Sequence, residues 1–292
     1  MNAKIWAALL ALAALAAPVA VASADPATWR VAGRNGGEIA LLGSMHVLRP
    51  SDYPLPKSVD ELIDRAQIIV MELDLDDVDA AAQQRVILQT AMLPQGTALA
   101  DVVDAGVYRL VQQTAAELGV DLDLLDRFEP WFLAITLLDQ GMRKLGFQAE
   151  RGIEQYVLGR SQQSGKEIVG LETLEFQIGI FDSLPAASQQ AMLEQTLAEL
   201  DEAATALDAM VKAWRDGELE DLSAELLDDF DQFPGLYAAL VTNRNSAWVP
   251  LLERLLGDGR RYLVVVGALH LVGEDNVIEL LRARGHAVER VH

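Results

Sequence analysis

The sequence contains no cysteine, and this absence excludes several kinds of chemistry. None of its 292 residues is a cysteine. The protein therefore has no disulfide framework, no thiol nucleophile and no cysteine-rich metal site. We expect its stability to come from a hydrophobic core.

Basic residues are also scarce. The chain has 23 Lys and Arg against 44 Asp and Glu, which gives a formal net charge of -21. Nucleic acids and anionic lipid surfaces are recognised by concentrations of positive charge. The composition argues against DNA, RNA or an anionic membrane surface as the partner.

Three common enzyme signatures are missing as well. The chain has no GxSxG nucleophile elbow, no Walker loop and no HExxH helix. We therefore expect neither an α/β-hydrolase serine, nor a nucleotide-binding P-loop, nor a zincin-type metal helix.

The amino terminus has the pattern of a secretory signal peptide. Lys4 precedes the Leu- and Ala-rich residues 5–17, and residues 22–24 (ASA) form a cleavage site. We expect residues 1–24 to be removed and the mature protein, beginning at Asp25, to be exported to the periplasm. The apolar segment is shorter than the roughly 20 residues that a spanning helix needs, so no stable membrane anchor is expected.

A GxxH motif occurs twice, each time after a strand-like apolar run. Residues 262–266 lead into Gly267 and His270, and residues 38–42 lead into a second GxxH that ends at His46. Glycine allows a tight turn or a close backbone approach. Each histidine is therefore expected just beyond the carboxyl end of a strand, where open α/β sheets bind their ligands.

Two further strand-like runs end in a glutamate. Residues 68–71 precede Glu72, and residues 167–171 precede Glu172. The rest of the chain between residues 78 and 240 is dominated by helical patterns, because its apolar residues recur at helical spacing. Helical crossovers between strands imply a largely parallel pairing.

These patterns predict an α/β fold with a central mixed, largely parallel sheet and a large helical insertion. Residues 25–292 are expected to form one domain, with the insertion at approximately residues 78–240. Residues 28–32 and 38–42 are predicted to pair as a hairpin, and residues 186–214 to form a long amphipathic helix.

Parallel strands bring their carboxyl ends to one edge, so His46, Glu72, Glu172 and His270 are expected to converge there. Two imidazoles and one or two carboxylates, with a position left for water, suit a divalent ion such as Zn, Mn or Co. Such an ion activates water for hydrolysis. The alternative is structural: a histidine can be a satisfied core residue, and a glutamate can cap a helix.

The expected roles within this group differ. Glu72 is favoured as the third metal ligand beside His46 and His270, with a general-base role as the alternative. Glu172 is favoured as the general base or as a residue that orients a histidine. Arg244, if it points into the site, would hold a substrate carboxylate or an oxyanion.

Six segments of the chain resemble the TraB/PrgY/GumN family, and within it the bacterial GumN-like branch. They are LLGSMHVL, IVMELD, EPW, GLETLEFQ, NRN and VVVGALHLVGEDN. The resemblance covers essentially the whole mature chain and implies the sheet-centred α/β fold of the animal Tiki proteins, which are metal-dependent proteases. Carried over by residue, it points to His46, His270 and Glu72. Where relatives often have an aspartate, this chain has Glu154.

The sequence therefore predicts an exported, divalent-metal-dependent hydrolase, most simply a peptidase acting on a peptide or protein substrate. The alternative is a non-catalytic periplasmic protein that binds a peptide or a metal complex. A hydrolase needs a base or an open metal position beside the histidines, whereas a binding protein does not.

Overall fold

A computed structural model describes residues 25–77, 80–200, 203–227 and 234–292 of the chain. The predicted signal peptide, residues 1–24, lies outside the described residues. Within the described part, no helix is both long enough and apolar enough to cross a membrane.

The core of the fold is a six-stranded sheet with the order β4-β3-β5-β2-β1-β6. The strands are β1 (Thr28–Ala32), β2 (Glu38–Ser44), β3 (Ile68–Leu73), β4 (Glu167–Glu172), β5 (Arg261–Gly267) and β6 (Val288–Arg290). Neighbours among β4, β3, β5 and β2 pair in parallel, whereas β1 is antiparallel to both β2 and β6. The predicted α/β class, its mixed and largely parallel sheet and its β1–β2 hairpin are confirmed.

Strands β2 and β5, which carry the two GxxH motifs, lie side by side. Their register pairs Gly43 with Val266 and Ser44 with Gly267. The two motifs are thus offset by one residue, and both leave the sheet at the same edge. A side chain on Gly43 would meet Ala268, so this glycine permits close packing of the two turns.

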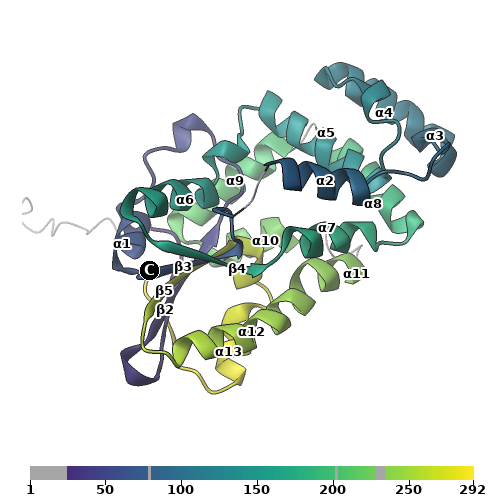
Figure 1. The fold of residues 1–292 in the computed structure, drawn as a ribbon. Coiled ribbons are helices and arrows are strands. Elements are labelled where there is room, and N and C mark those ends of the chain that lie inside the picture. The colour runs from purple at the N-terminus through teal and green to yellow at the C-terminus, as the bar shows by residue number, and fades with distance from the viewer. Residues whose placement is uncertain (1–24, 78–79, 201–202, 228–233) are drawn as a thin grey trace, which may run out of the picture.

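Helices cover both faces of the sheet (Figure 1). One face packs on α1 (Lys57–Arg65), α6 (Ile153–Ser164) and α9 (Ala203–Asp216), and the other on α12 (Asn243–Leu256) and α13 (Val277–Ala283). The strands alternate accordingly. In β2, Leu42 belongs to the first hydrophobic core and Leu41 to the second.

The remaining helices extend from the sheet toward the right of Figure 1, beyond the tip of β4. They include α2 (Ala80–Thr90), α3 (Leu99–Val102), α4 (Ala105–Leu118), α5 (Pro130–Lys144), α7 (Leu174–Asp182), α8 (Ala186–Glu199) and α11 (Pro234–Tyr237). Helix α10 (Leu219–Leu227) lies closer to the sheet, where its Leu222 joins the first core. A π-helical segment, η6 (Ala238–Thr242), leads into α12. Helices α4, α5 and α8 share a third core, built around Val111, Leu133 and Leu193.

The amphipathic pattern over residues 186–214 is not one helix. The structure describes two helices there, α8 and α9, which belong to different cores: Leu193 packs in the third core, whereas Trp214 packs against the sheet. Trp214 also donates from its ring nitrogen to the Gly43 carbonyl at 2.7 Å. A periodic pattern reports which face is apolar, and it does not report where the chain changes direction.

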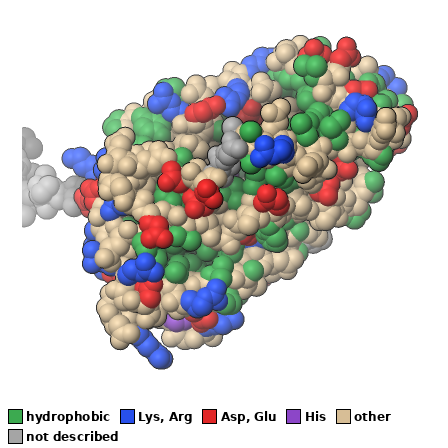
Figure 2. Space-filling view, viewed as in Figure 1, with side chains coloured by type: hydrophobic (Ala, Val, Ile, Leu, Met, Phe, Trp, Pro, Cys, Tyr) green, Lys and Arg blue, Asp and Glu red, His purple; other side chains and the backbone are tan. Residues whose placement is uncertain are grey.

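The described surface carries charges of both signs. Figure 2 shows Asp and Glu side chains interspersed with Lys and Arg on one face, with hydrophobic side chains between them. No continuous basic area is visible on that face.

Candidate functional site

The candidate site lies at the carboxyl edge of the four parallel strands. Glu72 is the penultimate residue of β3 and Glu172 the last residue of β4, while His46 and His270 follow β2 and β5. His270 lies in a single 3-10 turn, η7 (Ala268–Leu271). Strand order alone therefore places the two glutamates and the two histidines on neighbouring strands.

A cavity of about 500 Å³ opens over this edge, and we call it the strand-end cavity. His46, Glu72, Gln177, Arg244 and His270 supply most of its polar lining. Its apolar lining comes mainly from the surrounding helices and includes Met142, Ile180, Phe181, Leu207, Met210, Leu226 and Leu240. Functional pockets commonly combine apolar walls with a few converging polar groups.

Glu72 is held by several donors at once. Its Oε1 accepts from the Gly267 backbone N–H at 2.8 Å, and its Oε2 accepts from Arg244 Nη2 at 2.5 Å and Gln177 Nε2 at 3.1 Å. Burial opposes ionisation of this carboxyl, but the charges of His270 (when protonated) and Arg244 outweigh it, and the pKa of Glu72 falls to about 2. Glu72 is therefore a carboxylate at neutral pH.

Arg244 lies between the two glutamates. Nε contacts both oxygens of Glu172 at 3.0 and 3.1 Å, and Nη2 bridges Glu72 and Glu172 at 2.5 and 2.8 Å. Nη1 donates to the Leu240 carbonyl at 3.0 Å and contacts His270 Nε2 at 3.1 Å. All five N–H groups of the guanidinium thus have protein partners. This geometry favours a role in charge balance over the predicted capture of a substrate carboxylate or oxyanion.

Glu172 is similarly enclosed, with its side chain 6% exposed. Besides Arg244, its oxygens accept from Trp248 Nε1 at 2.8 Å and Gln177 Nε2 at 3.0 Å. Both oxygens are therefore occupied by protein donors. Of the two roles predicted for Glu172, the geometry favours orientation of neighbouring groups over transfer of a proton to or from a substrate.

Three residues of α12 contact His270. Arg244 contacts Nε2, Asn245 Oδ1 lies 2.7 Å from Nδ1, and the Trp248 ring centroid is 4.4 Å from that of the imidazole. The Asn245 amide is itself oriented, since its Nδ2 donates to the Asp275 carbonyl at 2.8 Å. Its oxygen must then face the histidine, so Nδ1 carries the proton and Nε2 is the acceptor.

Burial lowers the pKa of His270 to about 4, although the charge of Glu72 acts in the opposite direction. The imidazole is therefore neutral at neutral pH. Its Nε2 lies 3.7 Å from Glu72 Oε1, on the floor of the strand-end cavity.

His46 has a different environment. Its side chain is 67% exposed, and its Nδ1 lies 2.5 Å from Glu154 Oε1, which also accepts from Ser44 Oγ at 2.5 Å. The negative charge of Glu154 raises the pKa of His46 to about 9. Glu154 stands in the first turn of α6, where backbone N–H groups favour an anion.

Gly267 allows His46 and Glu72 to approach each other. A Cβ on this glycine would lie 3.1 Å from His46 Nε2 and 3.3 Å from Glu72 Oε1. A side chain at this position would crowd both functional groups. Space, rather than backbone conformation, explains a glycine at position 267, because its φ of -49° is accessible to any residue.

The residue types at this edge, two imidazoles and a carboxylate, are those that hold a divalent metal ion. Arg244 occupies the lone pair of His270 Nε2, and protein donors occupy both oxygens of Glu72, so these groups would exchange partners on binding an ion. His46, protonated at neutral pH, would release its proton. Both histidines engage Nδ1 with an oxygen of the protein, and they line the same cavity as Glu72. Metal-ligating histidines commonly show this arrangement. As they stand, the described residues include no group of three or more His, Asp or Glu side chains spaced to hold an ion.

The structure brings together all five residues predicted from the sequence: His46, Glu72, Glu172, Arg244 and His270. The network also includes four residues whose contacts the sequence did not predict: Asn245, Gln177, Trp248 and Ser44. Asn245 lies in the NRN segment and Gln177 in the GLETLEFQ segment, two of the segments that resemble the family. Trp248 is buried, and it also donates to Glu172.

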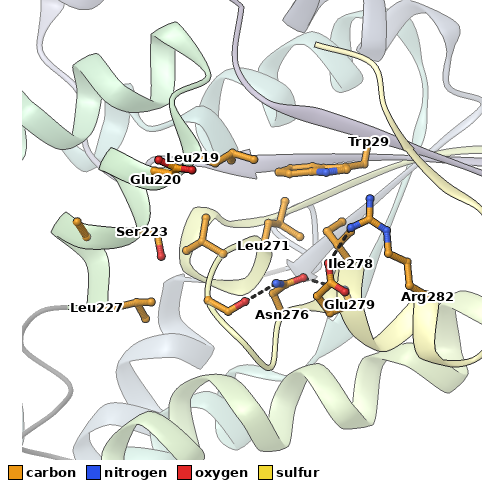
Figure 3. Close-up of a pocket in the computed structure, with 13 residues that line it drawn as sticks. Trp29, Leu219, Glu220, Ser223, Leu227, Leu271, Asn276, Ile278, Glu279 and Arg282 are labelled. Carbon is orange, nitrogen blue, oxygen red and sulfur yellow. Dashed lines mark hydrogen bonds and ion pairs between the residues drawn. The ribbon is translucent and has the colours of Figure 1, made fainter.

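A second cavity, of about 680 Å³, lies beyond His270, against Leu271 and Trp29 (Figure 3). Its polar groups are largely paired with one another. Asn276 donates to the Gly273 carbonyl at 2.5 Å, and Arg282 pairs with Glu279 at 2.7 Å. This cavity contains none of the strand-end glutamates or histidines.

Comparisons with known proteins agree with the resemblance noted in the motifs. The sequence profile of the TraB/PrgY/gumN family matches residues 27–290. The uncharacterized protein YbaP of Escherichia coli (strain K12) is 31% identical over 242 residues, which cover 83% of this chain and 87% of YbaP. An uncharacterized protein of Treponema pallidum (strain Nichols) is 24% identical over 284 residues, or 92% of this chain and 84% of its own. No solved structure matches the chain significantly.

We expect Arg244→Gln to lower the free energy of unfolding by roughly 3–5 kcal/mol, because two buried carboxylates lose their shared cation. Urea denaturation measures this loss. Adding Glu172→Gln should recover part of it. As a control, Arg160→Gln removes ion pairs to Asp60 and Asp64 on the surface and should cost about 0–1 kcal/mol. Equal losses in the two single variants would contradict the central role of Arg244.

We expect Asn245→Leu to weaken, but not to abolish, the preference of His270 for a proton on Nδ1, because Arg244 Nη1 still donates to Nε2. The change should cost roughly 1–3 kcal/mol of stability, because a buried donor loses its acceptor. Nitrogen NMR of the metal-free protein with labelled histidine reports the tautomer directly. Asn245→Asp keeps an acceptor and should retain the tautomer. Asn243→Leu, at an exposed position of the same helix, is the matched control. An unchanged His270 spectrum in Asn245→Leu would show that the tautomer has another cause.

Proposed function

The chain belongs to the TraB/PrgY/gumN family, and from the geometry of its strand-end cluster we propose that it is an exported, divalent-metal-dependent hydrolase that cleaves peptides. One observation carries the proposal: His46, Glu72 and His270 line one cavity, while other protein groups orient both imidazoles through Nδ1.

His46, Glu72 and His270 would hold the ion, and Zn, Mn or Co suits this mixture of nitrogen and oxygen ligands. When bound, such an ion supplies an activated water and polarises the carbonyl that is attacked. Glu154 orients His46, and Asn245 orients His270. Such outer partners fix the direction of a ligand and tune its basicity.

Arg244 and Glu172 contribute by positioning. Arg244 fixes one oxygen of Glu72, and the Gly267 N–H fixes the other. Glu172 in turn anchors the guanidinium through three contacts.

The decisive test pairs metal content with peptide turnover in the mature protein. We expect His46→Ala and His270→Ala each to weaken metal binding by roughly 100-fold or more, beyond the 10- to 100-fold that the loss of an outer partner causes. Glu72→Gln should weaken metal binding and slow cleavage by about 100-fold or more. Glu172→Gln should retain metal better than Glu72→Gln.

The matched control is His286→Ala. His286 pairs with Glu253 at 3.1 Å and lines neither the strand-end cavity nor the second cavity. Metal binding by His46→Ala and His270→Ala at the level of this control would refute the ligand assignment. A metal-loaded parent protein that binds peptides without cleaving them would favour the alternative function, a periplasmic binding protein.

Export rests on the signal-like residues 1–24, with the small residues at 22–24 before the predicted cleavage. We expect the intact mass of the periplasmic protein to correspond to a chain that begins at Asp25. Ala24→Leu, which places a bulky residue at the cleavage position, should leave the precursor uncut, whereas Ala27→Leu should be processed normally. Recovery of the full-length parent chain from the cytoplasm would overturn export.

A further inference from the structure

The walls of the strand-end cavity contrast with its floor. Above the histidines and glutamates, five helical elements present apolar side chains: Met142 of α5, Ile180 and Phe181 of α7, Leu207 and Met210 of α9, Leu226 of α10 and Leu240 of η6. Most of these side chains are only partly buried. Partly exposed apolar groups gathered in a concave site mark a place where an apolar ligand group is buried.

A third cavity, of about 700 Å³, adjoins the first, and we call it the outer cavity. Three residues line both cavities: Met142, Leu207 and Met210. The outer cavity runs between α5, α8 and α9, and its lining adds Leu138, Met192 and Leu200 together with the polar Gln195, Thr196 and Glu199. The apolar surface is therefore continuous from the strand edge into the helical region.

We propose that the strand-end cavity is a subsite for one bulky apolar side chain of a peptide substrate, next to the bond that is cleaved, and that the peptide continues into the outer cavity. Met142, Leu207 and Met210 then form the wall that determines specificity. This inference rests on the proposed hydrolase function and names its substrate class.

The chemistry of the walls selects against a saccharide. Sugar hydroxyl groups lose their water on binding and need hydrogen-bond partners in return, and the apolar walls of the strand-end cavity lack them among the residues described. A leucine, methionine or phenylalanine side chain gains from the same burial. The volume of about 500 Å³ lies within the roughly 300–1,000 Å³ of typical ligand pockets.

Methionine suits this position in the wall. Its unbranched, polarisable side chain adapts to ligands of different shape. Met142 and Met210 face both cavities, so we expect several bulky apolar side chains to be accepted and small polar or charged ones to be rejected.

The test is a binding series on the full mature protein with fluorescein-labelled heptapeptides that differ only at the central residue. We expect peptides with Leu, Met or Phe to bind more tightly than those with Ser, Asp or Lys by roughly 10- to 200-fold, the range that a few apolar pocket contacts supply. A neutral hexasaccharide serves as the competing probe. Equal or tighter binding of the polar peptides or of the saccharide would overturn the proposal.

Two variants of one wall residue should act in opposite directions. Met210→Ala enlarges the cavity and should improve binding of the Phe peptide relative to the Leu peptide, whereas Met210→Phe should do the reverse. Misfolding would not produce opposite shifts. Leu110→Ala is the control, because Leu110 is exposed on α4 and lines neither cavity. The same change of preference in Leu110→Ala, or none in either Met210 variant, would overturn the assignment of this wall.

Turnover separates this inference from the function on which it rests. Selective binding of apolar peptides without cleavage in the presence of Zn, Mn or Co would support the subsite and overturn the hydrolase. Cleavage at equal kcat/KM for apolar and polar peptides would support the hydrolase and overturn the subsite.

Discussion

The strand-end site depends on one buried cation. Arg244 bridges two carboxylates that would otherwise repel each other, and it also contacts the Nε2 atom of His270. Burying Glu72 and Glu172 at adjacent strand ends is unfavourable unless a cation with several donors accompanies them. A guanidinium meets this need because its planar fork donates in several directions at once. Glu172 is then best understood as the anchor of Arg244, and Glu72 as the carboxylate that remains directed toward His270 and the cavity.

The two histidines differ in burial, in protonation and in the contacts that position them. His270 is buried, neutral and held at both ring nitrogens, so its geometry is set by the fold before any ligand binds. His46 is exposed, and its ring is oriented by Glu154, which belongs to α6. The floor of the cavity therefore combines a rigid group with a more accessible one. This division agrees with the proposed function, in which a rigid pair, Glu72 and His270, is completed by a residue at the entrance.

In the proposed function, the helices around the strand-end cavity supply the substrate-facing part of the molecule. Strands β2, β3, β4 and β5 place the polar floor, whereas α5, α7, α9 and α10 place the apolar walls. In the proposed function the sheet thus contributes the chemistry and the helices the specificity. The two contributions can be tested separately, since Met210 belongs to the walls and Asn245 to the support of the floor.

By itself, the sequence determined the α/β class, the hairpin, the parallel strands and the residues at their ends, because strand periodicity and GxxH spacing are local properties of the chain. It also marked Arg244 as a candidate site residue. Only the tertiary structure decided what these side chains contact. The contacts of Arg244 and the pairing of Glu154 with His46 join segments that are far apart in the chain. The two helices within residues 186–214 pack into different cores, which are also built from distant segments. Such contacts depend on how helices pack against the sheet, and packing geometry is not encoded in the period of any one segment.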